Sequence, residues 1–215
     1  IAMPFACAAT AKSIEADVVS ALKRAGCKTI CFAIESGVEK IRKEIYNKNI
    51  SDGDIYNAAG VLASCDMPFL TFNIIGLPNE TLDDIFATVK INQEINTTYP
   101  WCSILQPYPG TQIAEIIEKQ IGRALSSKFA YSYFQSSIID DQEKKKIISR
   151  AQKLFAYFVK GKVNYKNFES LVKRPVLNTD KLYPLVFYWN YGSDIRARYG
   201  VTWFSLFRYW LYSRH

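Results

Sequence analysis

Four short apolar runs are spaced along the first half of the chain, and each is followed by a segment with helical periodicity. The runs cover residues 3–8, 28–34, 68–75 and 102–107, and they are nearly continuous in apolar residues. Strands that are buried on both faces of a parallel sheet have this composition, whereas a strand with one wet face alternates apolar and polar residues. The repeated order of strand and helix therefore predicts a parallel β/α architecture.

The helical segments carry recognisable start and stop signals. Ser51 with Asp54, and Thr81 with Asp84, resemble capping boxes in which Asp replaces the usual Glu. Gly122 follows the last periodic residue of the fourth helical segment, where a glycine often ends a helix. These signals predict helices that begin after Ser51 and Thr81 and a helix that ends before Gly122.

Apolar residues at helical spacing predict which side of each helix is buried. In the first helix the expected buried residues are Val18, Leu22 and Ala25, and in the helix after Ser51 they are Ile55, Ala58, Ala59 and Leu62. A long amphipathic helix is also expected within residues 140–162, with Ile147, Ile148, Ala151, Leu154, Phe155 and Phe158 on its apolar side.

The second half of the chain has a different character from about residue 125. It has helical patterns but no further strand-like runs, and residues 183–215 are rich in aromatic residues and arginine. The aromatic tail fits a helix that lies on a membrane surface or a partner, and it also fits a segment packed against the sheet, because large aromatics dominate core burial. We expect an α/β fold: a partial (β/α) barrel of about four parallel strands over residues 1–122, then a helical region over residues 123–215.

Composition and charge narrow the class of protein only a little. Hydrophobic residues make up 49% of the 215 residues, which is enough for a real core. The net charge of +7 suits an anionic ligand, but the positive residues are scattered as on a solvated helix face, so there is no strong nucleic-acid signal. No apolar run is long enough for a transmembrane segment. The chain begins with Ile inside a strand-like run and shows no signal peptide, so we expect a piece of a longer cytoplasmic protein.

Five cysteines, an odd number, favour reduced thiols over a disulfide framework. Cys27 and Cys31 have C-x3-C spacing, which can indicate a metal site. Burial in the sheet is the favoured interpretation, because the position three residues after Cys31 is Ile34, where an iron–sulfur motif would supply a third thiolate. No metal site is therefore predicted in this chain.

Polar residues and glycines follow three of the predicted strands. They are Glu35, Ser36 and Gly37, then Gly76 and Glu80, then Gln106 and Tyr108. The carboxyl ends of parallel strands meet at one edge, where β/α proteins bind ligands, so these residues are expected to lie close together. Glu35 can accept two hydroxyl hydrogen bonds, as a ribose requires, and Lys48 can meet a carboxylate. Each residue alone also fits a cap or turn, Glu80 especially, since a negative charge is favoured at a helix start.

Taken in order, the segments "AGCKTICFAIESGVEKIRKEIYNKNIS", "NIIGLPNETLDD" and "PYPGT" resemble radical S-adenosylmethionine enzymes. The resemblance covers residues 3–111 and is strongest to the cobalamin-binding branch that includes the magnesium-protoporphyrin cyclase and the P-methylase relatives. It implies that the chain is the second half of a (β/α)6 barrel, and that the enzyme uses S-adenosylmethionine, a [4Fe–4S] cluster and cobalamin.

The resemblance also implies roles for individual residues. Glu35 matches the carboxylate that contacts the ribose, and Ser36 and Gly37 complete that "ESG" motif. Lys48 matches a basic residue that reaches the methionine carboxylate. The strand from Asn73 to Gly76, followed by Glu80, matches the segment that backs the adenine, and Gln106 and Tyr108 line the next strand end. The catalytic residues remain unassigned.

The cluster motif of the family, C-x3-C-x2-C, is absent from this sequence. We therefore expect the chain to form part of the S-adenosylmethionine pocket and of the wall for a small-molecule substrate, and to be inactive alone. Exposed barrel edges would favour a homodimer. Two alternatives stay open: a non-catalytic binding or scaffold module with a basic, aromatic partner-binding tail, and a β/α enzyme that uses Glu35 and Glu80 for acid–base chemistry. The only histidine is His215, so no histidine-based triad is available.

Overall fold

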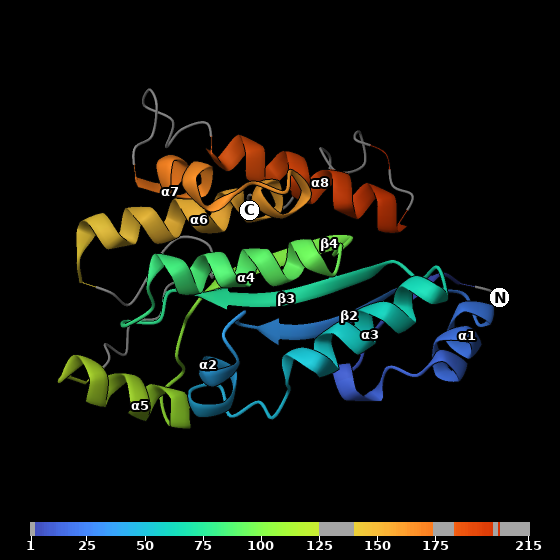
Figure 1. Ribbon diagram of the computed structural model, residues 1–215, viewed down its shortest axis with the longest axis horizontal. Coiled ribbons are helices and arrows are strands. Elements are labelled where there is room, and N and C mark those ends of the chain that lie inside the picture. The colour runs from blue at the N-terminus through green and yellow to red at the C-terminus, as the bar shows by residue number, and fades with distance from the viewer. Residues whose placement is uncertain (1–2, 125–139, 174–182, 200–201, 203–215) are drawn as a thin grey trace, which may run out of the picture.

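The protein is a four-stranded parallel sheet covered by helices, as seen in a computed structural model (Figure 1). The structure describes residues 3–124, 140–173, 183–199 and 202. Its elements are β1 (Phe5–Ala8), a 3-10 turn η1 (Ala11–Ser13), α1 (Ala16–Arg24), β2 (Cys27–Glu35), α2 (Glu39–Glu44), α3 (Asp52–Ser64), β3 (Phe69–Ile75), α4 (Leu82–Glu94), β4 (Tyr99–Ile104), α5 (Gln112–Ile121), α6 (Gln142–Lys160), α7 (Tyr165–Lys173) and α8 (Tyr183–Tyr199).

The strands lie in the order β1-β2-β3-β4, and every neighbouring pair is parallel. Sequential parallel strands joined by helices are what a barrel wall requires, so the predicted partial (β/α) barrel of four strands is confirmed. Three of the four strands begin and end within two residues of their predicted bounds. The fourth begins at Tyr99, three residues earlier than predicted, because Asn96 (φ 51°) ends the preceding turn early.

The local start signals were predicted correctly. In both α3 and α4 the capping box is complete: the side chain of Ser51 or Thr81 accepts from the third helical N–H, and the Asp side chain accepts from the cap residue's N–H. Gly122 adopts a left-handed conformation (φ 70°) at the end of α5. These features depend on four or five consecutive residues, which is why they can be read from the sequence.

One predicted helix face was wrong. Val18 is 47% exposed and Ala25 is also exposed, whereas Val19 is buried in the core and Leu22 packs against it. Val19 and Leu22 are three residues apart, so they share a face of α1. The adjacent valines made the pattern ambiguous by one position, and contact with the sheet selects Val19.

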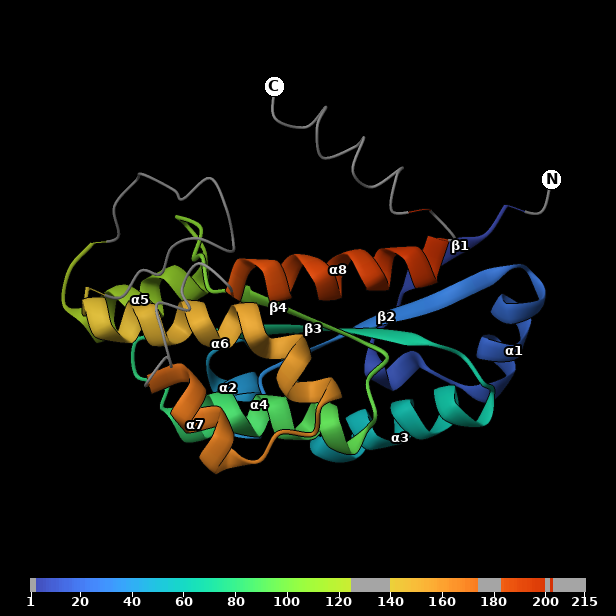
Figure 2. The ribbon, with the colours of Figure 1, turned by 90° about the horizontal axis from the view of Figure 1, so that it is seen from above.

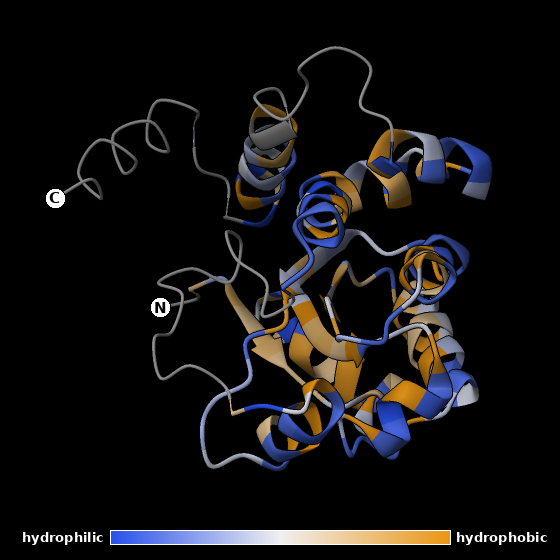
Figure 3. Ribbon diagram, turned by 90° about the vertical axis from the view of Figure 1, so that its left-hand side faces the viewer, coloured by the Kyte–Doolittle hydropathy of each residue, from blue (hydrophilic) through white to orange (hydrophobic). Residues whose placement is uncertain are grey.

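Two main hydrophobic clusters lie between the sheet and its helices, where Figure 3 shows apolar strands enclosed by helices with hydrophilic outer sides. One joins the β1–β3 side to α1, α3 and the end of α4; Ile55, Ala58, Ala59 and Leu62 are buried in it as predicted. The other joins β3 and β4 to α4, α6 and α7, and it holds most of the predicted apolar side of α6.

Helix α8 lies beside α6 and runs alongside β4 (Figure 2). The rings of Phe187 and Tyr191 pack against Trp101 of β4, while Leu185, Tyr188 and Trp189 are exposed. Residues 183–199 of the aromatic tail therefore pack against the sheet on one side; residues 203–215 lie outside the described part. Among the described helices, none combines the length and apolar character that crossing a membrane needs.

Candidate functional site

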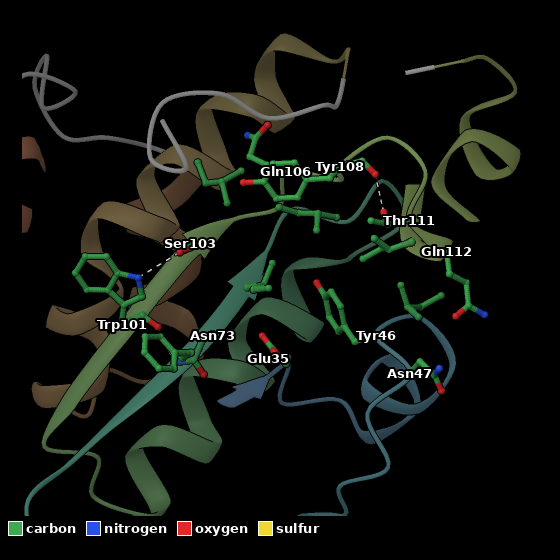
Figure 4. Close-up of a pocket in the computed structure, with 16 residues that line it drawn as sticks. Glu35, Tyr46, Asn47, Asn73, Trp101, Ser103, Gln106, Tyr108, Thr111 and Gln112 are labelled. Carbon is green, nitrogen blue, oxygen red and sulfur yellow. Dashed lines mark hydrogen bonds between the residues drawn. The ribbon is translucent and has the colours of Figure 1, made fainter. Parts of the chain in front are cut away.

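A pocket of about 540 Å³ lies at the carboxyl ends of β2, β3 and β4 (Figure 4). Its lining includes Glu35 from β2, Ile74 from β3 and Gln106 just after β4, so it is built by three successive strand ends. In Figure 4, Glu35 lies between Trp101 on one side and Tyr46 on the other, with Gln106 and Tyr108 above. The volume is in the range of pockets that hold small molecules.

Glu35 is the last residue of β2 and has an unusual backbone conformation, with φ of 66°. The pairing register with β3 shifts between Ala33 and Glu35, so the strand bulges just before its end. A non-glycine residue in this left-handed region is strained and is often found at functional sites. The bulge turns the Glu35 side chain into the pocket, where it is 13% exposed.

Lys48 is the charge partner of Glu35. Its Nζ lies 3.4 Å from Oε1 of Glu35, and its side chain is 46% exposed. Burial raises the pKa of Glu35, and the ammonium group of Lys48 opposes that rise. Glu35 is therefore a largely desolvated carboxyl group whose ionised form is favoured by one neighbour, and in that form it suits hydrogen bonds from ligand hydroxyls.

Ser36 and Gly37, also predicted to bind the cofactor, shape the loop after β2. The Ser36 side chain is buried, and its Oγ accepts from the Val38 N–H (3.2 Å). The Gly37 N–H donates to Oγ1 of Thr88 on α4 (2.8 Å), and a Cβ at Gly37 would lie 2.3 Å from the backbone of Ala87. Both residues thus fix how the loop meets α4, and neither lines the pocket.

Arg42, which sequence reasoning missed, anchors the same loop. Its side chain is fully buried and donates to the carbonyls of Ser36 (2.8 Å) and Ile50 (3.0 Å). It also pairs with Asp52 and lies 3.6 Å from Glu39. Arg42 lies in the charged stretch Glu39–Glu44, which resembles a solvated helix face, so the sequence carried no signal that its side chain is buried. The guanidinium ties the segment that carries Lys48 to the end of β2.

Gly76 and Glu80 form a closed turn after β3. Glu80 is 4% exposed, and its Oε2 accepts from the N–H groups of Gly76 and Leu77. Burial raises the pKa of Glu80 to about 7, against the lowering effect of those two hydrogen bonds. Glu80 lines a separate cavity of about 380 Å³ beside α2, together with Asp84 and Lys40, rather than the pocket that holds Glu35.

Asn73 contributes to the pocket lining, but its side chain belongs to a buried network. Its Nδ2 donates to the Trp101 carbonyl (2.9 Å) and to Oγ1 of Thr71 (3.1 Å), and its Oδ1 accepts from Asn92 on α4 (2.8 Å). Asn73 therefore joins β3, β4 and α4. Because every polar atom of the side chain has a protein partner, its direct contribution to ligand binding would come through the backbone.

Gln106 and Tyr108 lie on the pocket rim together with Glu35, as the sequence predicted for neighbouring strand ends. Tyr108 is 49% exposed, and its carbonyl accepts from Oγ1 of Thr111 (2.6 Å), which begins α5. Of the nine predicted site residues, four line this pocket, namely Glu35, Asn73, Gln106 and Tyr108, and a fifth, Lys48, pairs with Glu35.

Three aromatic lining residues were not predicted: Tyr46, Phe72 and Trp101. The Tyr46 hydroxyl is buried without a hydrogen-bond partner among the described residues, and burial, followed by the charges of Glu80 and Glu35, raises its pKa well above the usual value. Large aromatics near a strand end were the available signal, but an apolar run does not reveal which face each residue occupies.

The described cysteines do not form a metal site, and the described residues contain no group of three or more His, Cys, Asp or Glu side chains placed to hold a metal ion. Cys27 opens β2 and Cys31 lies within it, as expected, and both are buried in different hydrophobic clusters. Burial raises the pKa of the Cys7 thiol to about 11 and raises that of Cys31. Protonated buried thiols are poor metal ligands.

Comparison with known proteins supports the sequence resemblance at the level of fold. No family profile matches the chain. Over 98 residues, 46% of this chain, it is 34% identical to the uncharacterized methyltransferase PH0819 of Pyrococcus horikoshii, and that segment is 21% of the relative. The structure is similar to coproporphyrinogen III oxidase (HemN) from Escherichia coli, described as a radical SAM enzyme: the TM-score is 0.51 at 14% identity, over 73% of this chain and 32% of HemN.

A weaker structural match is TsrM from Kitasatospora setae, a radical S-adenosylmethionine methyltransferase solved with cobalamin and a [4Fe-4S] cluster, with a TM-score of 0.46 at 16% identity over 53% of this chain and 22% of TsrM. The HemN match shows that the chain has the fold of a radical SAM partial barrel. The chain spans about a third or less of the length of each of these proteins.

Proposed function

We propose that the chain forms part of a radical S-adenosylmethionine enzyme and supplies one side of its S-adenosylmethionine pocket. The observation that carries the proposal is Glu35, which leaves β2 in a strained conformation, enters the pocket and pairs with Lys48. The fold likeness to HemN and the sequence likeness to a methyltransferase support it. The whole enzyme would then act on a small-molecule substrate, by methyl transfer or another radical reaction.

The residues present fit S-adenosylmethionine. In this proposal the Glu35 carboxylate accepts hydrogen bonds from the two ribose hydroxyls, and the exposed end of Lys48 holds the methionine carboxylate. Gln106 and Tyr108 lie at the rim, where an adenine could meet polar groups. S-adenosylmethionine would supply an adenosyl radical when it is bound in a complete enzyme; the residues of this chain bind and orient it and exclude water from Glu35.

The described residues do not fit a [4Fe–4S] cluster, since they offer no set of three thiolates facing one point. The proposal therefore gives this chain no part in electron transfer, and it assigns the cluster and cobalamin to residues other than the described ones. It follows that the chain should bind S-adenosylmethionine without cleaving it.

Calorimetric titration of the 215-residue chain with S-adenosylmethionine, adenosine and methionine tests the proposal. Glu35→Gln should weaken the binding of S-adenosylmethionine and of adenosine by about 10- to 100-fold, because a hydrogen bond to a charged group contributes about 1.5–3 kcal/mol. Lys48→Met should instead weaken the binding of S-adenosylmethionine and of methionine. Glu115→Gln and Lys28→Met, at exposed positions outside the pocket, are the matched controls.

Adenosine and methionine each represent one half of S-adenosylmethionine, so the role of each residue is tested separately. If Glu35→Gln behaves like Glu115→Gln toward adenosine, the ribose assignment is wrong. If the chain binds none of the three ligands, the proposed function is rejected, and the alternative of a β/α module with another partner takes its place.

A further inference from the structure

The inner face of the sheet carries two neighbouring aromatic side chains close to Glu35. Phe72 of β3 and Trp101 of β4 are register partners, and Phe72 is paired with Ala33 on β2. Side chains at alternate positions of a strand share a face, so Phe72 and Ile74 point to the same side, and both line the pocket. We call Phe72 and Trp101 the aromatic wall.

Phe72 is exposed in a place where a phenylalanine is normally covered. Its side chain is 40% exposed although β3 has a strand on each side. Leu70, two residues earlier on the same face, is 3% exposed and packs with Tyr99. On this face of the sheet, Leu70 is covered by other residues, whereas Phe72 is not. The exposed ring of Phe72 therefore forms part of the pocket surface. An exposed aromatic in a concave site indicates contact with a ligand.

The other half of the aromatic wall is held rigidly. The Trp101 indole N–H donates to Oγ of Ser103 (3.3 Å; Figure 4), and on its far side the ring packs against Tyr191 and Phe187 of α8, with centroids 5.2 and 6.5 Å apart. A ring that is fixed before binding loses little entropy when a ligand stacks on it. Helix α8 therefore supports the wall from behind.

Charge and hydrogen-bonding groups are unevenly distributed over the pocket. Of the 16 lining residues, only Glu35 carries a formal charge, and Lys48 pairs with it. The amides of Asn47, Gln106 and Gln112 line the other parts of the pocket, whereas the indole N–H of the wall already has a partner. The polar residues beside the aromatic wall, Asn73 and Ser103, already have protein partners, so the wall offers a ligand mainly its aromatic surface.

We infer that the aromatic wall is the substrate subsite of this pocket and that it takes an uncharged planar ring, stacked on Phe72 beside the adenosyl group. The inference rests on the proposed function for the adenosyl group that would bind beside the ring. The chemistry of the subsite itself rests on Phe72 and Trp101. An aromatic ring gains stacking energy there. An anionic group on that ring would lie near Glu35 and would be disfavoured, because none of the 16 described lining residues carries a positive charge.

Saturation-transfer NMR with three probes tests the subsite: N-methylindole, its carboxylate derivative and cyclohexanol. The probes share a small size and differ in planarity and charge. We expect N-methylindole to bind at least tenfold more tightly than either of the others, and to stay bound when S-adenosylmethionine is added. Phe72→Ala should weaken the binding of N-methylindole about tenfold. Tyr157→Ala, which removes an aromatic ring that is 45% exposed on α6 and outside the pocket, should change nothing.

Three results would overturn the inference: unchanged N-methylindole binding in Phe72→Ala, equal binding of N-methylindole and cyclohexanol, or displacement of N-methylindole by S-adenosylmethionine, which would assign the wall to adenine. Circular dichroism of each variant establishes that it is folded. Binding of N-methylindole through Phe72 in a chain that does not bind S-adenosylmethionine would support the subsite and reject the proposed function, so the two failures are distinguishable.

Discussion

Lys48 Nζ lies 3.4 Å from Oε1 of Glu35, and this ion pair joins the end of β2 to the segment between α2 and α3. The two partners differ in exposure: Glu35 is 13% exposed and Lys48 is 46% exposed. Burial raises the pKa of Glu35, and the ammonium group of Lys48 opposes that rise. A ligand that approaches Lys48 also changes the environment of Glu35, so the pair couples the two halves of any ligand that touches both.

We predict that Lys48→Met shifts the pH dependence of adenosine binding to higher pH. Burial raises the pKa of Glu35 and Lys48 opposes the rise, so removing Lys48 should raise that pKa further. Binding through the carboxylate is present above this pKa and is lost as the pH falls through it. Calorimetric titration with adenosine over a range of pH measures the midpoint, and Lys28→Met serves as the control. An identical midpoint in Lys48→Met and wild type would contradict the prediction.

Glu80 should make the protein less stable at alkaline pH. The pKa of Glu80 is raised from 4.5 to about 7 in the folded protein, so folding favours the protonated form. This contribution to the free energy of unfolding is complete below about pH 4.5 and is lost as the pH rises through about 7. The expected loss between pH 5 and pH 8 is about 2–3 kcal/mol.

Glu80→Gln should remove most of that dependence, because a glutamine carbonyl can still accept from Gly76 and Leu77 without carrying a charge. Urea denaturation at both pH values measures the difference, with Glu115→Gln as the exposed control. If Glu80→Gln loses as much stability as wild type between pH 5 and pH 8, another group is responsible.

Gly37→Ala should destabilise the fold by several kcal/mol. The new Cβ would lie 2.3 Å from the backbone of Ala87 on α4, so the loop after β2 or the helix must move. Gly60→Ala is the matched control: nothing lies within 4 Å of its Cβ position, and alanine in a helix interior should gain up to about 1 kcal/mol. Thermal and urea denaturation compare the two. Opposite signs are expected, and equal effects would refute the packing argument.

Tyr46→Phe is expected to stabilise the unliganded protein by about 1 kcal/mol, because it removes a buried hydroxyl that has no partner among the described residues. Tyr56→Phe is the comparison, since that hydroxyl donates to Glu94 on the surface, and its loss should be neutral or slightly destabilising. Chemical denaturation gives both values. A less stable Tyr46→Phe protein would indicate that the hydroxyl has a partner.

The parts of the fold that could be predicted from the sequence are those set by neighbouring residues. The capping boxes at Ser51 and Thr81 need only four residues each, and the continuous apolar strands already indicate two covered faces. The position of Glu35 at a strand end was also readable, because β2 ends where its apolar run ends.

The unpredicted parts depend on contacts between distant segments. Asn73 does line the pocket, but the sequence does not reveal that its side chain bonds to Asn92, nineteen residues later on α4. The continuous run around Phe72 hid which side chains face inward, since alternation carries that information and a doubly covered strand lacks it. Trp101 is supported by Tyr191 of α8, and the sequence does not reveal that contact between distant segments.

The Gln152 amide of α6 donates to the Cys102 carbonyl (3.1 Å), which faces away from β3 on the outer side of β4. Helix α6 thus occupies a hydrogen-bonding position that a fifth strand would need there. Among the described residues no strand pairs with the outer edge of β1, so a strand contributed by another polypeptide would pair there instead. Of the two edges of the described sheet, the one at β1 is therefore the one that can accept a further strand.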